Sequence, residues 1–172
     1  IDHHASNKHF AKINYVNANA AANCENIAEV IEALGVKTDK VMADNLYTGI
    51  VTDTGCFKYQ NTTVNTHTVA AELMQRGADY YNINRVMFDT KSMARLRVES
   101  EAINGVEMYF DDKCALMTIT AEMQNATTPD ELEGITPIPR QIEGVIVGIT
   151  LREKAQGKYK CSVRTHEPID AS

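Results

Sequence analysis

An acid and two imidazoles stand together at Asp2, His3 and His4, close to the start of the sequence. They follow Ile1, which is predicted to end a strand, and open α/β sheets place ligands at the carboxyl ends of parallel strands. An imidazole nitrogen beside a carboxylate suits a transition metal, because the acid can ligate the ion or orient the ring. These residue types therefore favour a metal site near the start of the chain.

Asp53 is a second isolated acid, in the stretch TDTGCF between an apolar helix and a predicted strand. The threonine and glycine beside it permit a tight turn that points the carboxylate into a cleft. The same residue types are also common in ordinary turns and caps. The pattern alone leaves a metal ligand and a turn residue as alternatives.

The elements that must position these residues are mainly helices in the first part of the chain. Hydrophobic periodicity predicts helices over residues 20–35, 38–52 and 65–77, and a short strand over 56–60. Gly49 falls within the second helix, where it costs about 1 kcal/mol relative to alanine, so close backbone packing is its expected reason. The predicted inward face of the first helix is Ile27, Val30, Ile31 and Leu34, and the predicted caps are Thr38, Asn65 or Thr66, Gly35 and Gly77.

After about residue 90 the hydrophobic period shifts toward that of strands. A helix is expected over 92–105, with Ser92 as its N-cap, followed by a hairpin over 106–120 around an Asp-Asp-Lys turn. A second hairpin is expected over 143–165 around KAQG, and TPDELEG between the hairpins predicts a short helix with a capping box. The predicted inward face of the 92–105 helix is Met93, Leu96, Ser100 and Ile103, and Arg85, Arg95 and Arg97 are expected to be solvated.

The composition is that of a globular chain: of the 172 residues, 44% are hydrophobic and 23% are charged. The net charge of −6 excludes a global basic field, so a nucleotide-like substrate would need a local cationic pocket or a bound metal. No apolar run approaches the roughly 20 residues that span a bilayer, so no membrane partner is expected. Four scattered cysteines without a Cys-x-x-Cys pair argue against a zinc ribbon and are typical of reduced thiols in a cytoplasmic protein.

Three stretches, IDHHASN, LYTGIVTDTGCFKYQNTT and NTHTVAAEL, follow one another in the first part of the chain. Together they resemble the DHH phosphoesterase superfamily, most of all its nanoRNase/pAp-phosphatase branch, which includes proteins labelled exopolyphosphatase-related. Asp2-His3-His4 matches the motif that names the family, and Asp53 in Asp-Thr-Gly matches the motif after it. The later CSVRT is similar to a Ser-x-Arg-Ser stretch of the family's DHHA1 domain, with Thr165 where serine is usual. The resemblance covers essentially the whole chain.

The resemblance implies an α/β fold in which a truncated parallel-sheet DHH domain precedes a connecting helix and a mixed-sheet DHHA1-like domain. The implied ranges are 1–90 for the C-terminal part of the DHH domain, 91–104 for the helix and 105–172 for an incomplete substrate-binding domain. The family's first metal-binding motifs precede DHH, and a glycine-rich loop follows Ser-x-Arg-Ser; this sequence holds neither. We therefore expect a chain cut at both ends that carries part of the site, is inactive alone and forms homodimers or aggregates.

For the site, the resemblance implies a two-metal centre, usually of manganese, with magnesium as the alternative. His3 and Asp53 would ligate one ion. The implied catalytic residues are His4, which would contact or stabilise the scissile phosphate, and Asp2, which would act mainly by orienting its neighbours. The residues implied in substrate binding are Asn7, His67, Ser162, Arg164 and Thr165.

Two of these substrate residues have a plain structural alternative. His67 is also explained as a capping or packing histidine, and Arg164 as a solvent-facing arginine. The functional interpretation of Arg164 is a clamp for a phosphate or terminal nucleotide, which suits the planar fork of arginine. His9 and His166 are expected to be structural or exposed.

In function, the resemblance implies a manganese-dependent phosphodiesterase or phosphatase acting on short RNA or on nucleotide phosphates such as pAp. Four Phe, seven Tyr and no Trp provide no dense aromatic platform for long single strands, so a short substrate fits better. The alternative is a catalytically inactive nucleotide- or nucleic-acid-binding module of the same fold. Cyclic-dinucleotide phosphodiesterases, single-strand exonucleases and exopolyphosphatases remain rivals within the superfamily, whereas the DHHA1-like tail argues against an inorganic pyrophosphatase.

Overall fold

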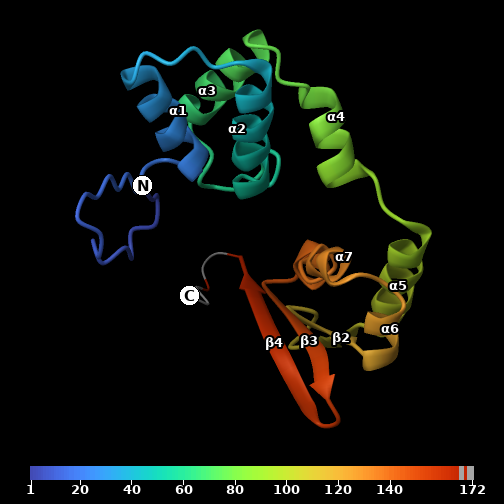
Figure 1. Ribbon diagram of the computed structural model, residues 1–172. Coiled ribbons are helices and arrows are strands. Elements are labelled where there is room, and N and C mark those ends of the chain that lie inside the picture. The colour runs from blue at the N-terminus through green and yellow to red at the C-terminus, as the bar shows by residue number, and fades with distance from the viewer. Residues whose placement is uncertain (167–168, 170–172) are drawn as a thin grey trace. The chain divides into compact units, whose positions relative to one another are not determined.

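The computed structural model describes residues 1–166 and 169 of the chain, which divides into two compact units, Ile1–Thr90 and Lys91–Ser172. The first unit is built of helices, and the second combines a four-stranded sheet with helices (Figure 1). The α/β class expected from the sequence is therefore confirmed. The assignment of the ranges 1–90, 91–104 and 105–172 to domains of the family stays a prediction.

Three helices form the core of the first unit. α2 (Lys40–Asp53) packs against both α1 (Asn23–Ala33) and α3 (Val64–Gln75), and α4 (Tyr80–Asn84) runs on into a π-helical turn at Arg85–Asp89 (Figure 1). The buried side chains at the centre are Ala22, Ala43, Leu46, Tyr47, Ile50, Val51, Ala70, Leu73 and Ala78.

Two helix starts differ from the prediction. α2 begins after Asp39, whose carboxylate accepts a hydrogen bond of 2.8 Å from an N–H of the first turn, so the N-cap is not Thr38. α3 begins after Thr63, which forms a capping box with Thr66, so the cap is neither Thr66 nor Asn65. Several residues able to cap stand in a row at both places, and the one whose oxygen reaches a free N–H of the first turn becomes the cap.

The predicted helix ends at Gly35 and Gly77 are confirmed, because both glycines have the left-handed φ of such caps, 67° and 98°. Leu34, by contrast, does not join the core and is 72% exposed, since α1 ends at Ala33. Gly49 is explained by close packing, as predicted. A Cβ at this position would overlap the sulfur of Cys24 on α1.

The predicted strand at residues 56–60 is wrong. The chain makes a turn there, with φ of 56°, 57° and 64° at Gly55, Cys56 and Phe57. The hydroxyl of Thr54 holds this turn by accepting a hydrogen bond of 3.1 Å from the N–H of Phe57. Extended backbone is incompatible with positive φ, so aromatic and apolar residues in this stretch do not build a sheet.

The strand expected to end at Ile1 is reduced to a single bridge. Asp2 pairs in parallel with Val16, its N–H donating to the carbonyl of Tyr15 at 3.0 Å and its carbonyl accepting from the N–H of Asn17 at 3.1 Å. This bridge fixes the backbone of the Asp-His-His tripeptide within the first unit.

The sheet of the second unit has the strand order β1-β2-β3-β4. β1 (Glu107–Tyr109) and β2 (Cys114–Ile119) form the first predicted hairpin, and β3 (Val147–Ala155) and β4 (Lys158–Thr165) form the second. β2 and β3 run parallel, so the sheet is mixed, as expected. β4 lies at one edge and carries the Ser-x-Arg stretch.

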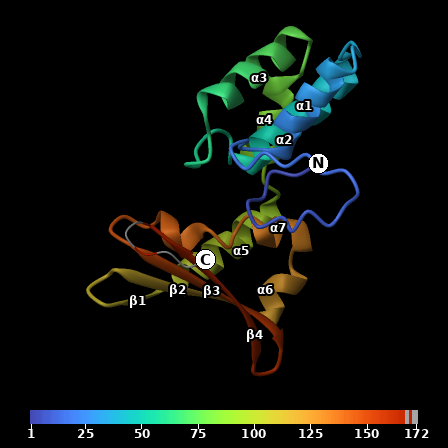
Figure 2. The same ribbon diagram turned by 90° about the vertical axis from the view of Figure 1, so that its left-hand side faces the viewer.

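Figure 2 shows helices beside this sheet. Alternate residues of β2 are buried. The helices are α5 (Met93–Asn104), α6 (Ala121–Asn125), α7 (Pro129–Glu133) and the 3-10 turn η2 (Ile138–Gln141). Thr128 and Glu131 form the predicted capping box at the start of α7. The buried core residues of the unit are Val98, Ala102, Met117, Ile119, Met123, Leu132 and Ile135.

The inward face of α5 differs from the prediction. Met93, Leu96 and Ile103 are 64%, 42% and 50% exposed, whereas Val98 and Ala102 are buried. The face that packs on the sheet is therefore rotated from the one that the hydrophobic pattern indicated.

Glu99 occupies a place in this buried face because two cations neutralise it. Lys91 Nζ and Arg95 Nε donate to its two carboxylate oxygens at 2.8 Å and 2.9 Å. Arg95 is thus held in an ion pair and is not simply solvated, contrary to the prediction.

No helix among residues 1–166 and 169 has the length and apolar character needed to cross a membrane. The four cysteines are free thiols.

Candidate functional site

The carboxylate of Asp2 is the centre of a hydrogen-bond cluster in the first unit. Its Oδ1 accepts from the N–H of His3 at 2.7 Å, from the N–H of His4 at 3.2 Å and from Nδ1 of His4 at 2.7 Å. Its Oδ2 accepts from the side-chain amide of Asn7 at 2.6 Å. The bond from Asn7, followed by those from His4 and His3, holds the pKa of Asp2 well below its ordinary value. Asp2 is therefore a fixed anion that orders both histidines and Asn7.

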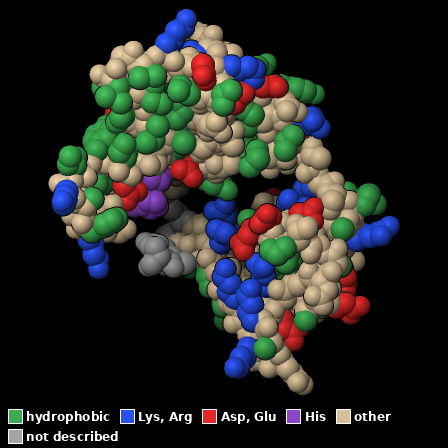
Figure 3. Space-filling model, in the orientation of Figure 1, with side chains coloured by type: hydrophobic (Ala, Val, Ile, Leu, Met, Phe, Trp, Pro, Cys, Tyr) green, Lys and Arg blue, Asp and Glu red, His purple; other side chains and the backbone are tan. Residues whose placement is uncertain are grey.

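The imidazole of His3 is oriented by the backbone. Its Nδ1 lies 3.2 Å from the carbonyl oxygen of Ala20, which can only accept, so Nδ1 carries the proton and Nε2 has a free lone pair. Nε2 faces the Oδ2 of Asp53 at 3.7 Å, although the two residues are 50 positions apart in the sequence. Figure 3 shows histidine side chains flanked by acidic ones on this surface of the first unit.

The His3–Asp53 pair fits the requirements of a metal ion. Histidine ligands commonly hold their second ring nitrogen on a backbone carbonyl, as His3 does here. Two ligands each about 2.0–2.2 Å from one ion can lie up to about 4.4 Å apart, and the observed separation is 3.7 Å. Within the described part of the chain, however, no group of three or more His, Cys, Asp or Glu side chains is arranged to hold a metal.

His4 is placed differently from His3, although the two are adjacent. Its Nδ1 is committed to Asp2, and its side chain is 69% exposed. The two imidazole rings meet edge to face, with centroids 4.5 Å apart. The Nε2 of His4 is therefore accessible at the surface beside the His3–Asp53 pair.

Two residues that the sequence analysis missed hold this arrangement together. Asn61 donates from Nδ2 to the carbonyls of Ala21 and Asp53 at 3.0 Å and 3.2 Å, which ties the segment behind His3 to the end of α2. Glu25, almost fully buried, accepts from the N–H of Ala21 at 3.1 Å. Asn61 lies in a turn and Glu25 in a helix, so neither has a local pattern that reveals these contacts.

Glu25 also joins α1 to α3. Its carboxylate accepts from the hydroxyl of Thr66 at 2.9 Å and from the amide of Asn65 at 3.0 Å. The two residues expected to cap α3 thus bind a buried acid instead, which satisfies the charge that burial would otherwise penalise.

His67 does not join the cluster around Asp2. Its exposed ring stacks on Phe57, with centroids 4.8 Å apart and an interplanar angle of 23°. This packing contact matches the structural alternative for His67, and its proposed role in substrate binding stays a prediction.

In the second unit, β4 separates the three predicted substrate residues between two faces. Arg164 and Ser162 lie opposite Gly148 and Thr150 of β3, and alternate residues of a strand share one face. Thr165 lies on the other face by the same alternation. Ser162 and Arg164 can therefore act on one ligand together, whereas Thr165 belongs to the opposite side of the sheet.

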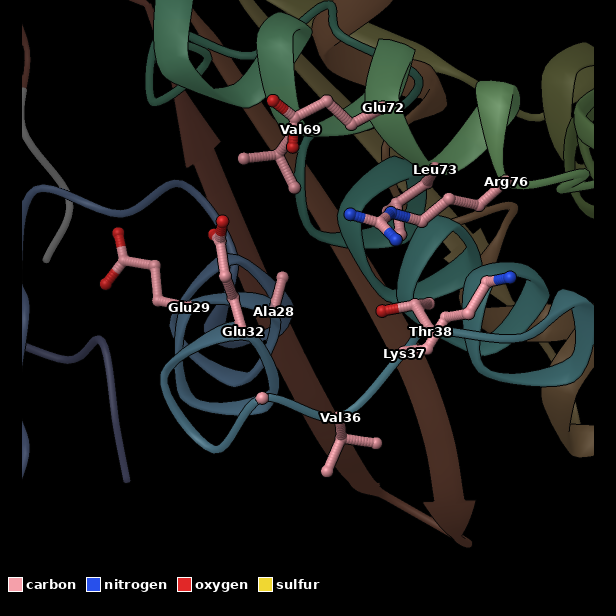
Figure 4. A pocket seen from close by; sticks show the side chains of 11 residues that line it. Ala28, Glu29, Glu32, Val36, Lys37, Thr38, Val69, Glu72, Leu73 and Arg76 are labelled. Atoms are coloured by element: carbon pink, nitrogen blue, oxygen red, sulfur yellow. The ribbon is translucent and has the colours of Figure 1, made fainter.

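A cavity of about 280 Å³ lies elsewhere in the first unit, between α1, the segment after it and α3. Figure 4 shows Glu29, Glu32 and Glu72 toward one side of it and Arg76 and Lys37 toward the other. None of the predicted site residues lines this cavity. The candidate site is thus the surface formed by His3, His4 and Asp53 and not this cavity.

Comparisons with known proteins bear on the whole chain. No family model matches the sequence. Over 99% of its length the chain is 30% identical to a protein named bifunctional oligoribonuclease and PAP phosphatase NrnA in Thermus thermophilus, covering 51% of that protein. Over 98% of its length it is 26% identical to a probable protein of the same name in Streptococcus mutans, covering 54%. The chain thus spans about half the length of the curated relatives it matches.

A solved structure gives the same result at the level of the fold. The crystal structure of an exopolyphosphatase-related protein from Bacteroides fragilis matches 96% of this chain with a TM-score of 0.87 and 29% identity, over 50% of its own chain. Together with the Asp-His-His and Asp-Thr-Gly motifs, these similarities support the resemblance of the chain to the DHH phosphoesterase superfamily, in its nanoRNase/pAp-phosphatase branch.

Proposed function

We propose that the full-length protein is a metal-dependent phosphoesterase that hydrolyses short oligonucleotides or nucleotide phosphates. The observation that carries the proposal is the pair formed by His3 Nε2 and Asp53 Oδ2, 3.7 Å apart, with the other ring nitrogen of His3 fixed on a carbonyl. The names of the relatives, which describe an oligoribonuclease and PAP phosphatase, support the class of substrate.

In this proposal His3 and Asp53 hold one divalent ion, manganese by preference and magnesium as the alternative. A second ion would need ligands other than these two. A bound pair of divalent ions supplies charge neutralisation and an activated water in phosphoryl transfer. The chain's own contribution is to fix the two donor atoms, through Ala20 behind His3 and through Asn61 behind Asp53.

His4 is proposed to contact the phosphate that is cleaved. In its doubly protonated form, Nδ1 donates to Asp2, as the structure has it, and Nε2 is left to donate to a phosphate oxygen. Hydrolysis forms a bond from water oxygen to phosphorus and breaks the bond to the departing ribose oxygen, which ends protonated. Asp2, a fixed anion with both oxygens engaged, orients His4 and Asn7 and takes no proton itself.

The remaining residues are proposed to bind substrate away from the cleaved bond. Asn7 is held by Asp2 beside the two histidines. Ser162 and Arg164, on one face of β4, would grip a phosphate that is not cleaved, and roles for His67 and Thr165 are proposed on the family resemblance alone.

The second candidate is a binding module without turnover. It is favoured by one observation: among residues 1–166 and 169, no more than the His3–Asp53 pair is arranged for a metal. This candidate predicts that nucleotide phosphates bind but are not hydrolysed.

The deciding experiment measures phosphate release from pAp and from a dinucleotide by the full-length protein, with manganese and with EDTA. We expect release with manganese only, and a loss of about 10²-fold or more in Asp53→Asn and in His4→Gln. The matched control is Asp112→Asn, an equal charge change at an exposed turn residue with φ of 61°, which asparagine tolerates. Binding of pAp without release under any metal condition would instead establish the module.

A further inference from the structure

The peptide group that orients His3 is hydrogen-bonded at both ends. Its carbonyl oxygen, that of Ala20, accepts from Nδ1 of His3 at 3.2 Å, and its N–H, that of Ala21, donates to Oε1 of Glu25 at 3.1 Å. Both groups belong to the single peptide bond between Ala20 and Ala21. Glu25 therefore lies at the far end of one peptide group from the ring of a proposed metal ligand.

This acid is almost fully buried, with 1% of its surface exposed. Besides the N–H of Ala21, the hydroxyl of Thr66 and the side-chain amide of Asn65 donate to it, at 2.9 Å and 3.0 Å. Donors on both oxygens suit the ionised carboxylate, which can only accept. The three donors are all uncharged, so they satisfy the hydrogen bonds of Glu25 without neutralising its negative charge.

Helix capping alone does not explain the contact with Ala21. Glu25 is the third residue of α1, after the N-cap residue Ala22. In a capping box, the acid at this position binds the N–H of the N-cap residue itself. Glu25 instead binds the N–H one residue earlier, and that N–H belongs to the peptide group that faces His3.

The start of α3 fixes the carboxylate of Glu25 in turn. Thr66 donates its hydroxyl hydrogen to Glu25, and its oxygen accepts from the N–H of Thr63 at 3.1 Å. A continuous series of hydrogen bonds thus runs from α3 through Glu25 and one peptide group to His3. Hydrogen bonds in such a series polarise one another, so a negative charge at the N–H end of a peptide strengthens its carbonyl oxygen as an acceptor.

We propose that Glu25 is a positioning residue for His3 and acts through the peptide group between Ala20 and Ala21. By strengthening the carbonyl of Ala20 as an acceptor, it keeps the His3 proton on Nδ1 and leaves the lone pair of Nε2 toward Asp53. Metal-binding histidines commonly donate from the second ring nitrogen to such an acceptor, which raises their basicity as ligands. That the lone pair serves a divalent ion rests on the proposed function; the fixed position of the proton does not.

Glu25→Gln is the deciding variant because it removes the charge and keeps the shape. The new amide oxygen can still accept from Ala21 and Thr66, and the amide of Asn65 can turn to offer its oxygen to the new NH2 group. Thermal unfolding of the full-length protein verifies that the variant folds. If it does not, Glu25→Asp decides, because it draws the carboxylate back from Ala21 by one methylene and should act in the same direction.

The first measurement needs no metal. In the full-length protein with EDTA, nitrogen NMR of the imidazole rings at about pH 8.5, where histidine is ordinarily neutral, gives the ratio of the Nδ1–H form to the Nε2–H form. Comparison with His3→Gln identifies the signals of His3. We expect the Nδ1–H form to dominate in the wild type and the ratio to fall about 3-fold or more in Glu25→Gln. A purely structural role would not move this ratio in a variant that folds.

The second measurement is the dissociation constant of manganese, from the electron paramagnetic resonance signal of the free ion. We expect it to rise about 10-fold in Glu25→Gln, because losing a residue that supports a metal ligand usually weakens metal binding by this factor.

Two variants serve as controls. Glu32→Gln removes the same charge from an exposed position at the end of α1. Asn65→Ala removes one hydrogen bond of Glu25 but leaves the one from Ala21, so it matches the loss of a contact between α1 and α3. We expect neither control to change the ratio of the two His3 forms or the manganese constant by more than about 2-fold.

The two measurements separate this role of Glu25 from the proposed function. An unchanged ratio in Glu25→Gln, or an equal shift in Glu32→Gln, would overturn the role of Glu25. If Asp53→Asn loses manganese while Glu25→Gln matches the wild type in both measurements, Glu25 has no such role and the proposed function stands. If the ratio shifts as expected but the full-length protein binds no manganese, Glu25 positions His3 and the proposed function fails.

Discussion

At the scale of single residues, the difference between the adjacent histidines comes from what their Nδ1 atoms bind. A carbonyl behind His3 leaves its Nε2 free toward Asp53, and the carboxylate of Asp2 fixes the ring of His4 toward the surface. A carbonyl and a carboxylate both accept, so both rings keep a proton on Nδ1. Identical side chains next to each other can thus serve a metal and a phosphate separately.

Asn61 gives a prediction at this scale, because it positions Asp53 without touching an ion. Removing its two donated hydrogen bonds in Asn61→Ala should loosen the end of α2 relative to the segment behind His3. We expect the manganese concentration for half-maximal activity of the full-length protein to rise about 10-fold or more. The reason is that losing a residue that supports a metal ligand usually weakens metal binding by this factor. Asn19→Ala, at an exposed position of the same unit, should leave it unchanged. An unaltered manganese requirement in Asn61→Ala would remove Asn61 from the site.

The proximity of Asp2, His3 and Asp53 could be predicted from the sequence, and the residues that support them could not. The paired motifs predicted that His3 and Asp53 lie close together, although the pattern around Asp53 alone also allowed a plain turn residue. Asn61 and Glu25 act through contacts with residues about 40 positions away, and nothing in their own neighbourhood records those contacts.

At the scale of helices and strands, the packing of α1 on α2 depends on a residue without a side chain. In Gly49→Ala the new methyl group would overlap the sulfur of Cys24. Overpacking costs about 1–3 kcal/mol, and alanine returns about 1 kcal/mol of helix propensity, so we expect a net loss of about 1 kcal/mol in unfolding free energy. Denaturant unfolding should show recovery when Cys24→Ala is added, as a double-mutant cycle detects coupled neighbours. If the losses in unfolding free energy from the two substitutions were strictly additive, Gly49 and Cys24 would not be coupled.

Glu99, the buried acid of α5, is expected to make the unfolding free energy of the second unit depend on pH. Burial alone would raise the pKa of Glu99, but the hydrogen bonds and charges of Lys91 and Arg95 outweigh it and leave the pKa below its ordinary value. A lowered folded-state pKa adds stability above the unfolded value of about 4.3, and this stability is lost as the pH falls through the folded value.

Glu99→Gln should therefore lower the unfolding free energy at pH 7 by about 1–3 kcal/mol, the value of hydrogen bonds to charged groups. The difference from the wild type should shrink below about pH 4, where the wild-type carboxyl also becomes neutral. Glu101→Gln, on the exposed side of the same helix, is the control. A deficit that stays constant from pH 7 to pH 3 would show that the charge of Glu99 does not stabilise the fold.

Helix ends and hairpins could be predicted where neighbouring residues determine them. Features that depend on tertiary packing could not. The capping box of α7, the glycine ends of α1 and α3, and both hairpins follow from residues within a few positions of each other. The inward face of α5 does not, because an acid with two cationic partners displaces apolar residues from the core. The residues 56–60 look like a strand in type, but the left-handed turn after α2 prevents one.

At the scale of the whole chain, the number of free metal donors sets what the 172-residue polypeptide can do. Both carboxylate oxygens of Asp2 and the Nδ1 of His4 are already engaged, and the Nε2 of His4 is proposed to contact phosphate. Among the motif residues this leaves His3 Nε2 and Asp53 for an ion. A hydrolytic metal usually needs three protein ligands, and a two-metal centre needs ligands for both ions. We therefore propose that this polypeptide alone does not hydrolyse nucleotide phosphates.

The expected result is no manganese-dependent phosphate release from pAp by a preparation whose intact mass is 19.1 kDa. Activity should appear only in a longer polypeptide that brings further ligands to His3 and Asp53. Robust turnover at an intact mass of 19.1 kDa would mean that two ligands suffice, and the site would then have to hold its ions through the substrate itself.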